Sequence, residues 1–354
     1  RAAPNAAIQV NGTFTVTRGL FDYGAFRLAI NENVSLSSGV TVGRTSSTGR
    51  LVFGATVDQT ITTLGATIVS MEINKTTANR TVSLASGNLT ITGTLTLTDG
   101  IFNINTRRLT FNGASAAISG TGYSTTKMIQ MAGNAGDGGL EMYFNANETI
   151  VYPIGTNANS SVRYSPVTAT TQSFADDGLI RISIEDRLLQ LANLPATNSL
   201  SYNWRANHSN FTTLPRISYQ FTYDQTDADG SEASYVPGKV LTGTPFTRSS
   251  EDGTDINTTT NVLTFNGTTT GGGFPGAGFT LENAAYTGGS NGMFTGTPET
   301  YYNLNTGQLG WEDNNKWSLI SHTGSATNQS PGPGDIAIVR NFGEANGNAW
   351  IIMD

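Results

Sequence analysis

The sequence has no cysteine, little charge and few of the residues that favour helices. Only 13% of its 354 residues are charged, and Lys occurs only at positions 75, 127, 239 and 316. Without cysteine, disulfides contribute nothing to stability, so backbone ladders and apolar burial must supply it. A net charge of −7 and the shortage of Lys argue against nucleic acid as a partner. No stretch approaches the roughly 18 apolar residues of a membrane-spanning helix, so we expect no direct membrane insertion.

The chain is instead dominated by Thr, Gly, Asn and Ser. These four types account for 156 of the 354 residues, or 44%. Thr favours the pleated sheet, whereas Gly, Asn and Ser favour tight turns. A hydrophobic fraction of 37% is enough to build a core, which argues against disorder. The composition therefore predicts an all-β protein with many short strands.

An internal repeat refines this prediction for the first 122 residues. The segment from Gly12 to Ile30 aligns without gaps to the segment from Gly93 to Phe111 at an offset of 81, with eight of 19 pairs identical. Apolar residues alternate with polar ones in both copies, and Gly recurs at the same turns. Such recurrence favours a solenoid of about four coils of roughly 20 residues per offset. The alternative is a pair of similar hairpins in a β-sandwich.

Changes in composition and in strand length divide the rest of the chain into three parts. Residues 123–287 contain longer and more aromatic strands joined by irregular loops, a pattern typical of a β-sandwich. Residues 288–298 are expected to form a linker, and residues 299–354 the start of a second β-helix module. The predicted fold is therefore all-β, with right-handed β-helix segments flanking a β-sandwich-like domain.

Several short motifs then follow one another in a recognisable order. They are a Tyr-x-Pro-x-Gly-like turn at 152–155, Arg-Tyr-Ser-Pro-Val-Thr at 163–168, a Trp strand at 202–205, paired stretches at 221–224 and 232–238, and a Trp-x-Asp…Trp-Ser…Pro-Gly-x-Gly-Asp segment at 311–335. Together with the Thr/Gly-rich repeats, this order resembles the large repetitive cell-surface and secreted proteins of Bacteroidota-type bacteria, many of them exported by the type IX system. In that family the last segment tends to open a β-helix module.

The resemblance implies a non-enzymatic structural or adhesive module in a large surface protein or filament. It implies an extracellular location on the cell surface of a Gram-negative bacterium. It also implies contacts with neighbouring modules, or with copies of the same chain, through the solenoid ends, and surface glycans are a further candidate partner. The family's signal peptide and C-terminal sorting domain do not occur in this sequence, so the export route follows from the family alone.

Candidate catalytic groups are sparse. The first 122 residues hold five acidic residues and no His, and the adjacent pair Asp176 and Asp177 falls in a predicted turn. His208 and His322 lie 114 positions apart among polar loop residues. We therefore predict that the chain is not an enzyme. The alternative is a carbohydrate-binding or carbohydrate-active β-helix protein, which would need two close carboxylates or coplanar exposed aromatic rings.

The best candidate metal site is an acidic segment in the second half. Asp224, Asp227, Asp229 and Glu232 offer closely spaced carboxylates ahead of and around a turn glycine, which suits the hard cation Ca²⁺. The spacing does not fit a twelve-residue calcium loop, because Val236 stands where the bidentate Glu belongs. The alternative interpretation is a solvated acidic loop. No other cofactor is expected.

Two further patterns each have a structural interpretation. Alternating Thr, as in the run from Thr90 to Thr98, could order water and bind ice, but outward Thr is also what strand propensity favours. Aromatic residues could stack on sugars or fill a core, and we expect Trp204 in a core and Trp311 and Trp317 at a module junction. The other aromatic candidates are Tyr301, Tyr302 and Trp350. No carbohydrate-binding residues can be assigned from sequence.

Overall fold

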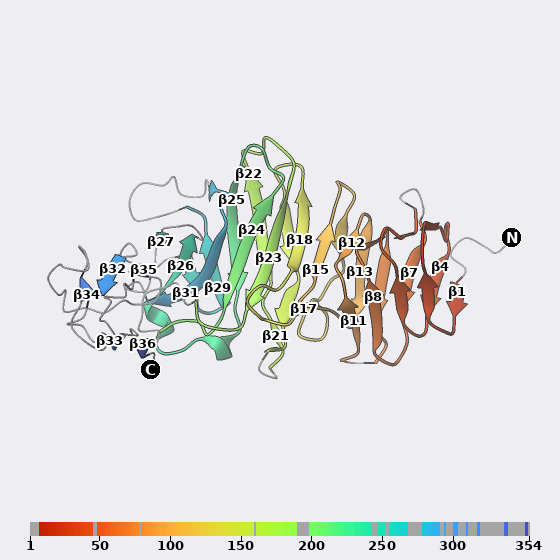
Figure 1. The fold of residues 1–354 in the computed structure, drawn as a ribbon, viewed down its shortest axis with the longest axis horizontal. Coiled ribbons are helices and arrows are strands. Elements are labelled where there is room, and N and C mark those ends of the chain that lie inside the picture. Colours follow the sequence, from red (N-terminus) through yellow and green to blue (C-terminus); the bar gives the residue numbers. More distant parts are fainter. Residues whose placement is uncertain are drawn as a thin grey trace, which may run out of the picture.

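The computed structural model describes most of the chain as far as residue 290. The described residues are 7–44, 48–77, 79–158, 161–189, 198–241, 247–251, 255–267, 278–290 and 294, with five short strands beyond them. Figure 1 shows two joined parts, a stack of coils at the N-terminal end and a block of longer strands beside it. The protein is all-β, as predicted, and contains a β-solenoid of six coils.

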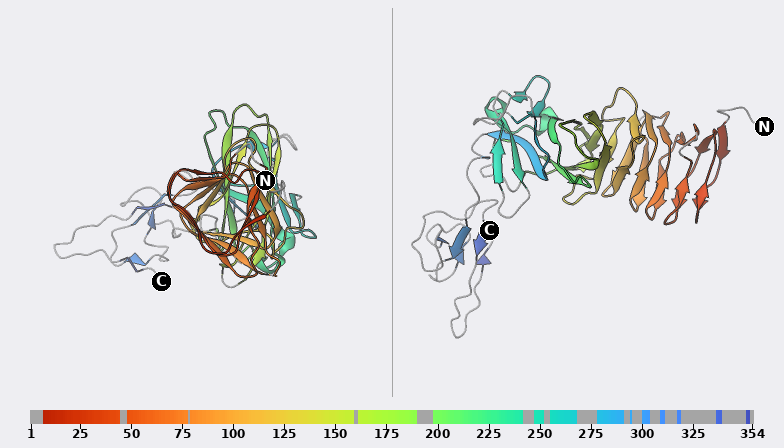
Figure 2. Two further views of the ribbon diagram at one scale, coloured as in Figure 1. Left: turned by 90° about the vertical axis from the view of Figure 1, so that its right-hand side faces the viewer. Right: turned by 90° about the horizontal axis from the view of Figure 1, so that it is seen from above.

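Each coil of the solenoid contributes one strand to each of three parallel sheets, which we call faces one, two and three. Face one contains β1 (Ala7–Val10), β4 (Arg27–Ile30), β7 (Arg50–Phe53), β10 (Met71–Asn74), β13 (Thr94–Asp99) and β16 (Ala117–Ser119). Face two contains β2 (Phe14–Val16), β5 (Val34–Leu36), β8 (Gln59–Thr63), β11 (Thr81–Ser86), β14 (Ile101–Asn105) and β17 (Ile129–Met131). Face three contains β3 (Leu20–Phe21), β6 (Thr41–Val42), β9 (Ala66–Ile68), β12 (Leu89–Ile91), β15 (Arg108–Phe111) and β18 (Gly139–Phe144). The view along the solenoid in Figure 2 shows these coils lying one behind another.

Stacked apolar side chains fill the interior of the coils. On face one, Leu28 pairs with Leu51, Leu51 with Met71, and Met71 with Leu95, and each is at most 3% exposed. Because side chains alternate across a strand, the intervening polar residues point outward. A second buried column on the same face runs through Ile30, Phe53, Ile73 and Leu97. These columns give a continuous core, since each coil covers the next.

The 81-residue repeat relates strands, not whole coils. It superposes β2 on β13 and β4 on β15, a shift of eleven strands, so a motif on face two in the first copy lies on face one in the second. The expected four coils per repeat are therefore wrong, because three strands make one coil and eleven do not divide by three. The prediction that Gly recurs at the same turns is confirmed for Gly19 and Gly100. Their φ angles are 78° and 90°, a region that L-residues with side chains rarely adopt.

A buried polar cluster occupies one corner between faces one and two. Lys75 is fully buried, and its ammonium group donates to the carbonyl oxygens of Ala55 (3.2 Å) and Val57 (2.9 Å) and to the side chain of Gln59. Burial lowers the pKa of Lys75 to about 8. A Cβ atom at Gly100 would lie 2.6 Å from the Lys75 Cβ, so glycine is required there for the lysine to fit.

The solenoid passes into the sandwich without a break in its sheets. β18 pairs in parallel with β15 and antiparallel with β23, so face three continues into an antiparallel sheet. This sheet runs through β23 (Gly178–Glu185), β24 (Asn203–Ser209), β31 (Ala284–Ser290), β26 (Tyr235–Leu241) and β27 (Thr247–Ser250). Face two likewise continues through β20 (Ile154–Thr156) and β21 (Arg163–Tyr164). The sixth coil therefore extends to residue 144, beyond the boundary predicted at residue 122.

A second antiparallel sheet covers the first to form the sandwich. It contains β19 (Thr149–Tyr152), β22 (Val167–Gln172), β25 (Arg216–Thr222), β29 (Val262–Phe265) and β28 (Ile256–Asn257), with β30 (Phe279–Thr280) also paired to β25. Aromatic rings join the two sheets, as where Phe221 stacks on Tyr286 with ring centres 5.1 Å apart. Trp204 is fully buried among these rings, as predicted, and its indole N–H donates to the carbonyl oxygen of Ser165.

The remaining elements are short. Two 3-10 turns, η2 (Gln225–Asp227) and η3 (Glu232–Ser234), lie between β25 and β26. Residues 288–290, expected to open a linker, instead end β31 and pair with β26. Of the predicted second β-helix module, only β32 (Thr300–Asn303), β33 (Leu309–Gly310), β34 (Trp317–Ser318), β35 (Ile336–Ile338) and β36 (Ile351–Ile352) are described. Within the described residues, no helix is long and apolar enough to cross a membrane.

The stacked columns make a direct prediction about stability. Leu89 on β12 is fully buried between Ala66 and Leu109 of the adjacent coils, whereas Thr90 points outward. We expect Leu89→Ala to lower the free energy of unfolding by about 2–5 kcal/mol through lost burial and the cavity left behind. The matched variant Thr90→Ala should change it by about 0.5 kcal/mol or less. Urea unfolding measures both, and equal effects would contradict the assigned orientation of β12.

Candidate functional site

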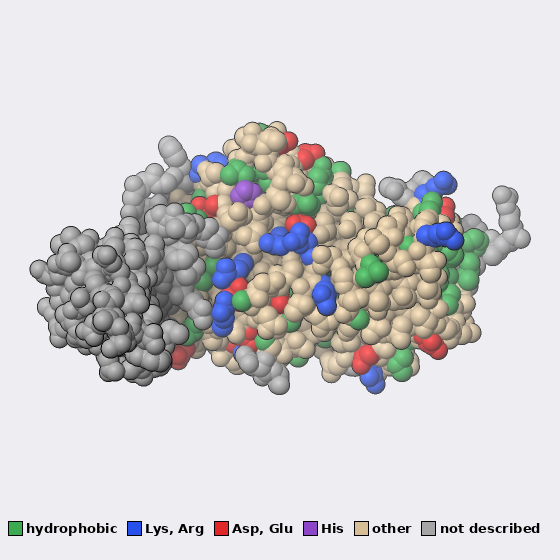
Figure 3. All heavy atoms as spheres, viewed as in Figure 1, with side chains coloured by type: hydrophobic (Ala, Val, Ile, Leu, Met, Phe, Trp, Pro, Cys, Tyr) green, Lys and Arg blue, Asp and Glu red, His purple; other side chains and the backbone are tan. Residues whose placement is uncertain are grey.

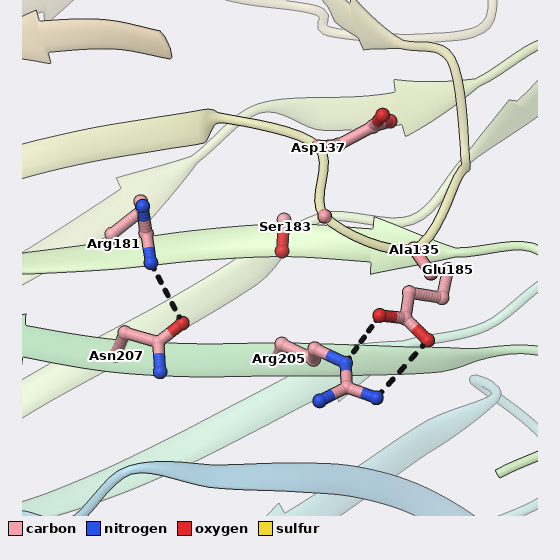
Figure 4. Close-up of a pocket in the computed structure, with 8 residues that line it drawn as sticks. Ala135, Asp137, Arg181, Ser183, Glu185, Arg205 and Asn207 are labelled. Atoms are coloured by element: carbon pink, nitrogen blue, oxygen red, sulfur yellow. Dashed lines mark hydrogen bonds and ion pairs between the residues drawn. The ribbon is translucent and has the colours of Figure 1, made fainter. Parts of the chain in front are cut away.

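A polar pocket lies on the outward surface of the sheet that solenoid and sandwich share. Strands β23 and β24 provide its floor, and the loop 135–137 before β18 provides one wall (Figure 4). Alternation places Ile180, Ile182 and Ile184 of β23 in the core, so the residues between them face outward. The lining residues are Ala135, Gly136, Asp137, Arg181, Ser183, Glu185, Arg205 and Asn207. The pocket has a volume of about 330 Å³.

The antiparallel register brings the polar side chains of the two strands together. Arg181 pairs with Asn207 and Ser183 with Arg205 across β23 and β24. One guanidinium nitrogen of Arg181 donates to the Asn207 side-chain oxygen at 3.1 Å. Arg205 forms a two-point ion pair with Glu185, whose carboxylate is buried (Figure 4). Two-point pairing of this kind holds a guanidinium in one orientation.

The charged side chains that line this pocket, two arginines and two carboxylates, are unevenly paired. Glu185 contacts two cations, because Arg187 also lies 3.1 Å from its carboxylate. Arg181 forms no ion pair with any of the described residues, and the nearby Glu141 acts on it only through its charge. Burial, together with the nearby Arg108, lowers the pKa of Arg181. In Figure 3, Lys and Arg side chains gather on this side of the molecule, near the middle of the view.

A column of threonines leads along face three to the pocket. Thr41, Thr67, Thr90 and Thr110 are paired in register on four successive coils. Thr110 then pairs with Glu141 on β18, and its hydroxyl donates to that carboxylate at 2.9 Å. Glu141 in turn pairs with Arg181. The pocket thus continues a row of polar groups that starts on the solenoid.

The four predicted calcium ligands lie on and around the two 3-10 turns. Asp224 caps η2, accepting from the backbone N–H of Thr226 at 3.0 Å and from its hydroxyl at 2.7 Å. Glu232 accepts hydrogen bonds from the Tyr223 hydroxyl and from the side chain of Gln225. Among the described residues, no group of three or more acidic or histidine side chains is arranged to hold a metal ion. Calcium binding therefore remains a prediction of the sequence.

Asp227 differs from its neighbours because it is buried. One carboxylate oxygen lies 2.7 Å from the Arg163 Nε atom and accepts from the Ser201 hydroxyl, while the other is buried without a hydrogen-bond donor. Asp186 shares Arg163, with an N–O distance of 3.1 Å. Burial raises the pKa of Asp227 to about 6, although Arg163 acts in the opposite direction. Asp227 thus ties η2 to β21, an arrangement that the sequence did not indicate. Asp229 is exposed on the adjoining loop.

The remaining candidate groups are placed as follows. Asp176 accepts from the backbone and side chain of Thr212, and Asp177 accepts from the Tyr143 hydroxyl, so each carboxylate has its own partner. The His208 ring is partly buried beside Phe211, which lowers its pKa. Trp317 is buried. His322, Trp311 and Trp350 lie outside the described residues, as do the side chains of Tyr301 and Tyr302.

The first coil presents an exposed apolar edge. Among the described strands, β1, β2 and β3 each have a strand partner on one side only. Ile8 is 45% exposed and Phe21 is 37% exposed there, whereas Leu28 and Val42, which pair with them on the next coil, are buried. Leu20 is 55% exposed at an outward position, next to Thr41. Phe21 contacts Phe14 edge to face, with ring centres 5.0 Å apart. The edge thus offers both backbone hydrogen-bonding groups and apolar surface.

Sequence reasoning did not find the pocket. Its residues come from three separate segments, and only the strand register brings them together. The one available signal is the strict alternation of Arg181, Ser183 and Glu185 with three isoleucines, which marks a strand with one polar face.

Comparisons with known proteins add no relative. No family model matches the chain, and no curated protein or solved structure matches it either. What the molecule does is therefore argued from its own residues and geometry.

The raised pKa of Asp227 predicts a pH-dependent contribution to stability. Its pKa is about 6 in the folded protein and ordinarily 3.8, so folding favours the protonated form. The stability that the neutral group contributes is present below pH 3.8 and is lost as the pH rises through about 6. We expect the stability of Asp227→Asn relative to the wild-type protein to rise by about 3 kcal/mol between acidic and neutral pH, at about 1.4 kcal/mol per pKa unit.

Urea unfolding across this pH range measures the difference, with the exposed Asp229→Asn as the matched control. A wild-type and Asp227→Asn difference that does not change with pH would contradict the assignment.

The calcium hypothesis can be tested at the same loop without disturbing the buried pair of Asp227 and Arg163. If calcium binds, its heat in isothermal titration should disappear in the double variant Asp224→Asn/Glu232→Gln, which removes two charged ligands. Binding should also raise the melting temperature of the wild-type protein. Absence of heat with the wild-type protein would rule out the site.

Proposed function

We propose that this chain is a non-enzymatic structural and adhesive module of a large extracellular bacterial surface protein or filament. The observation that carries the proposal is the continuous eleven-stranded sheet, which runs from the first coil of the solenoid through the sandwich. Such a sheet transmits load along the molecule through backbone hydrogen bonds, because its eleven described strands are hydrogen-bonded one to the next from β3 to β27. An elongated, continuous body suits a stalk (Figure 1).

Composition and sequence resemblance support the location. The low charge, the abundant Thr and Asn and the order of motifs resemble those of the repetitive surface proteins of Bacteroidota-type bacteria. On this proposal the module lies outside a Gram-negative cell and reaches it by type IX export.

The edge of the first coil supports a role in assembly. Its backbone groups and the exposed side chains of Ile8, Leu20 and Phe21 are suited to pairing with the strands of another module or another copy. The proposal therefore assigns this edge as a joint between modules.

A charge placed on the edge should abolish this pairing. We expect the wild-type protein to associate end to end with increasing concentration. Ile8→Glu should stay monomeric, because Ile8 ends the buried column of Leu28 and Leu51, so that a stacked copy would bury the charge. Leu64 is 65% exposed on the flank of the solenoid, so Leu64→Glu is the matched control and should associate normally. Sedimentation velocity and electron microscopy of the particles measure both. A wild-type protein that remains monomeric, or equal loss in both variants, would argue against the joint.

A further inference from the structure

The pocket between β23, β24 and the loop 135–137 is lined by polar and charged side chains, as a binding site is. The proposed structural role does not explain this lining. We propose that it binds an acidic sugar, held through the carboxylate or sulfate group of that sugar. The proposal adds a ligand to the adhesive role and does not depend on association through the first coil.

The pairing of the charges points to an anion. The lining holds two arginines, Arg181 and Arg205, and two carboxylates, Asp137 and Glu185. Glu185 is paired with Arg205 and with Arg187. Asp137 directs one carboxylate oxygen to the backbone N–H groups of Gly133 and Asn134 in its own loop. Arg181 is therefore the lining cation that has no ion-pair partner among the described residues.

Arg181 is the group best placed to hold the anion. Among the described residues its guanidinium donates one hydrogen bond, to the neutral side chain of Asn207, and so retains further N–H donors. Arg205 is fixed by Glu185 and lies on the neighbouring strand, with the Ser183 hydroxyl between the two arginines (Figure 4). Guanidinium groups match the planar fork of a carboxylate and also hold sulfate oxygens.

The lining distinguishes an acidic sugar from other anions. Apart from Ala135 and Gly136, every lining side chain is polar or charged, which disfavours a lipid or an aromatic acid. Ser183 and Asn207 can exchange hydrogen bonds with sugar hydroxyls. The buried carboxylate of Glu185 stands close by, so a singly charged group fits better than a doubly charged phosphate. A volume of about 330 Å³ is at the lower end of small-molecule pockets, the size of one sugar unit.

The threonine column suggests how a longer chain would lie. Thr41, Thr67, Thr90 and Thr110 point outward on the same sheet and lead through Glu141 to Arg181. Their hydroxyls could contact further units of a polysaccharide whose charged unit occupies the pocket. Oligomers should accordingly bind more tightly than single sugars.

Isothermal titration and melting-temperature measurements test the proposal on the full chain. The probes are oligomers of galacturonate, oligomers of mannuronate, sulfated galactose oligomers, galactose, acetate and inorganic phosphate. We expect at least one charged oligomer to bind, galactose and acetate to bind much more weakly, and Arg181→Gln to weaken binding tenfold or more. The uronate and sulfate arms show which oxyanion the pocket prefers, and binding of either supports the proposal.

Two variants make the result interpretable. Arg80 pairs with Asp58 on the solenoid, away from the pocket lining, so Arg80→Gln is the matched control and should bind like the wild-type protein. Asn207→Ala keeps both arginines and should weaken binding if Arg181 needs its partner. Binding should persist in Ile8→Glu, so a failure of association and a failure of sugar binding can be told apart. No binding of any charged oligomer, stronger binding of phosphate, or unchanged binding by a folded Arg181→Gln protein would overturn the proposal.

Discussion

The hydrogen-bonded ladder from one strand to the next is the constraint on which the rest of the molecule depends. In the solenoid it runs in parallel from coil to coil, and at β18 it changes to antiparallel without losing its partner. Backbone groups buried in this way are satisfied by neighbouring strands. With no cysteine and little charge available, the ladder and the apolar columns beneath it provide the stability that disulfide-rich proteins obtain from their cross-links.

The ladder also explains why outward positions can carry chemistry. Inward side chains are committed to the core by coil stacking, whereas outward ones are limited only by solubility and strand propensity. On face three of the solenoid a column of these positions is filled by Thr, and where this face enters the sandwich they change to Arg, Glu and Asn. The binding pocket that we propose thus lies where regular stacking ends and the loops become long enough to form a wall.

The sequence predicted the all-β architecture and the solenoid correctly, but it did not predict where the solenoid ends. Alternation, as in Leu89 and Ile91, identified the strands, and the repeat identified the solenoid because recurring turns require recurring coils. The number of coils per repeat was wrong because an alternating Thr and Leu strand is the same on every face. The boundary at residue 122 was wrong because composition changes within the sixth coil while the pairing of β15 with β18 continues.

The site could not be predicted in the same way. Strand segments close to β23 and β24 were expected, but their antiparallel register was not, and that register places Ser183 opposite Arg205. The acidic segment was noted for its composition, yet the burial of Asp227 depends on Arg163, which lies 64 positions earlier in the chain. Long-range pairings of this kind leave no local periodicity to detect.

The eleven-strand spacing of the repeat has a consequence for how such a body could be lengthened. A solenoid enlarged by whole coils keeps every later element in the same direction around its axis. Adding eleven strands instead advances the chain by three coils and two further sides, so whatever follows is turned by two-thirds of a revolution. Adding one such unit would therefore change both the length of the solenoid and the direction in which the sandwich projects from it.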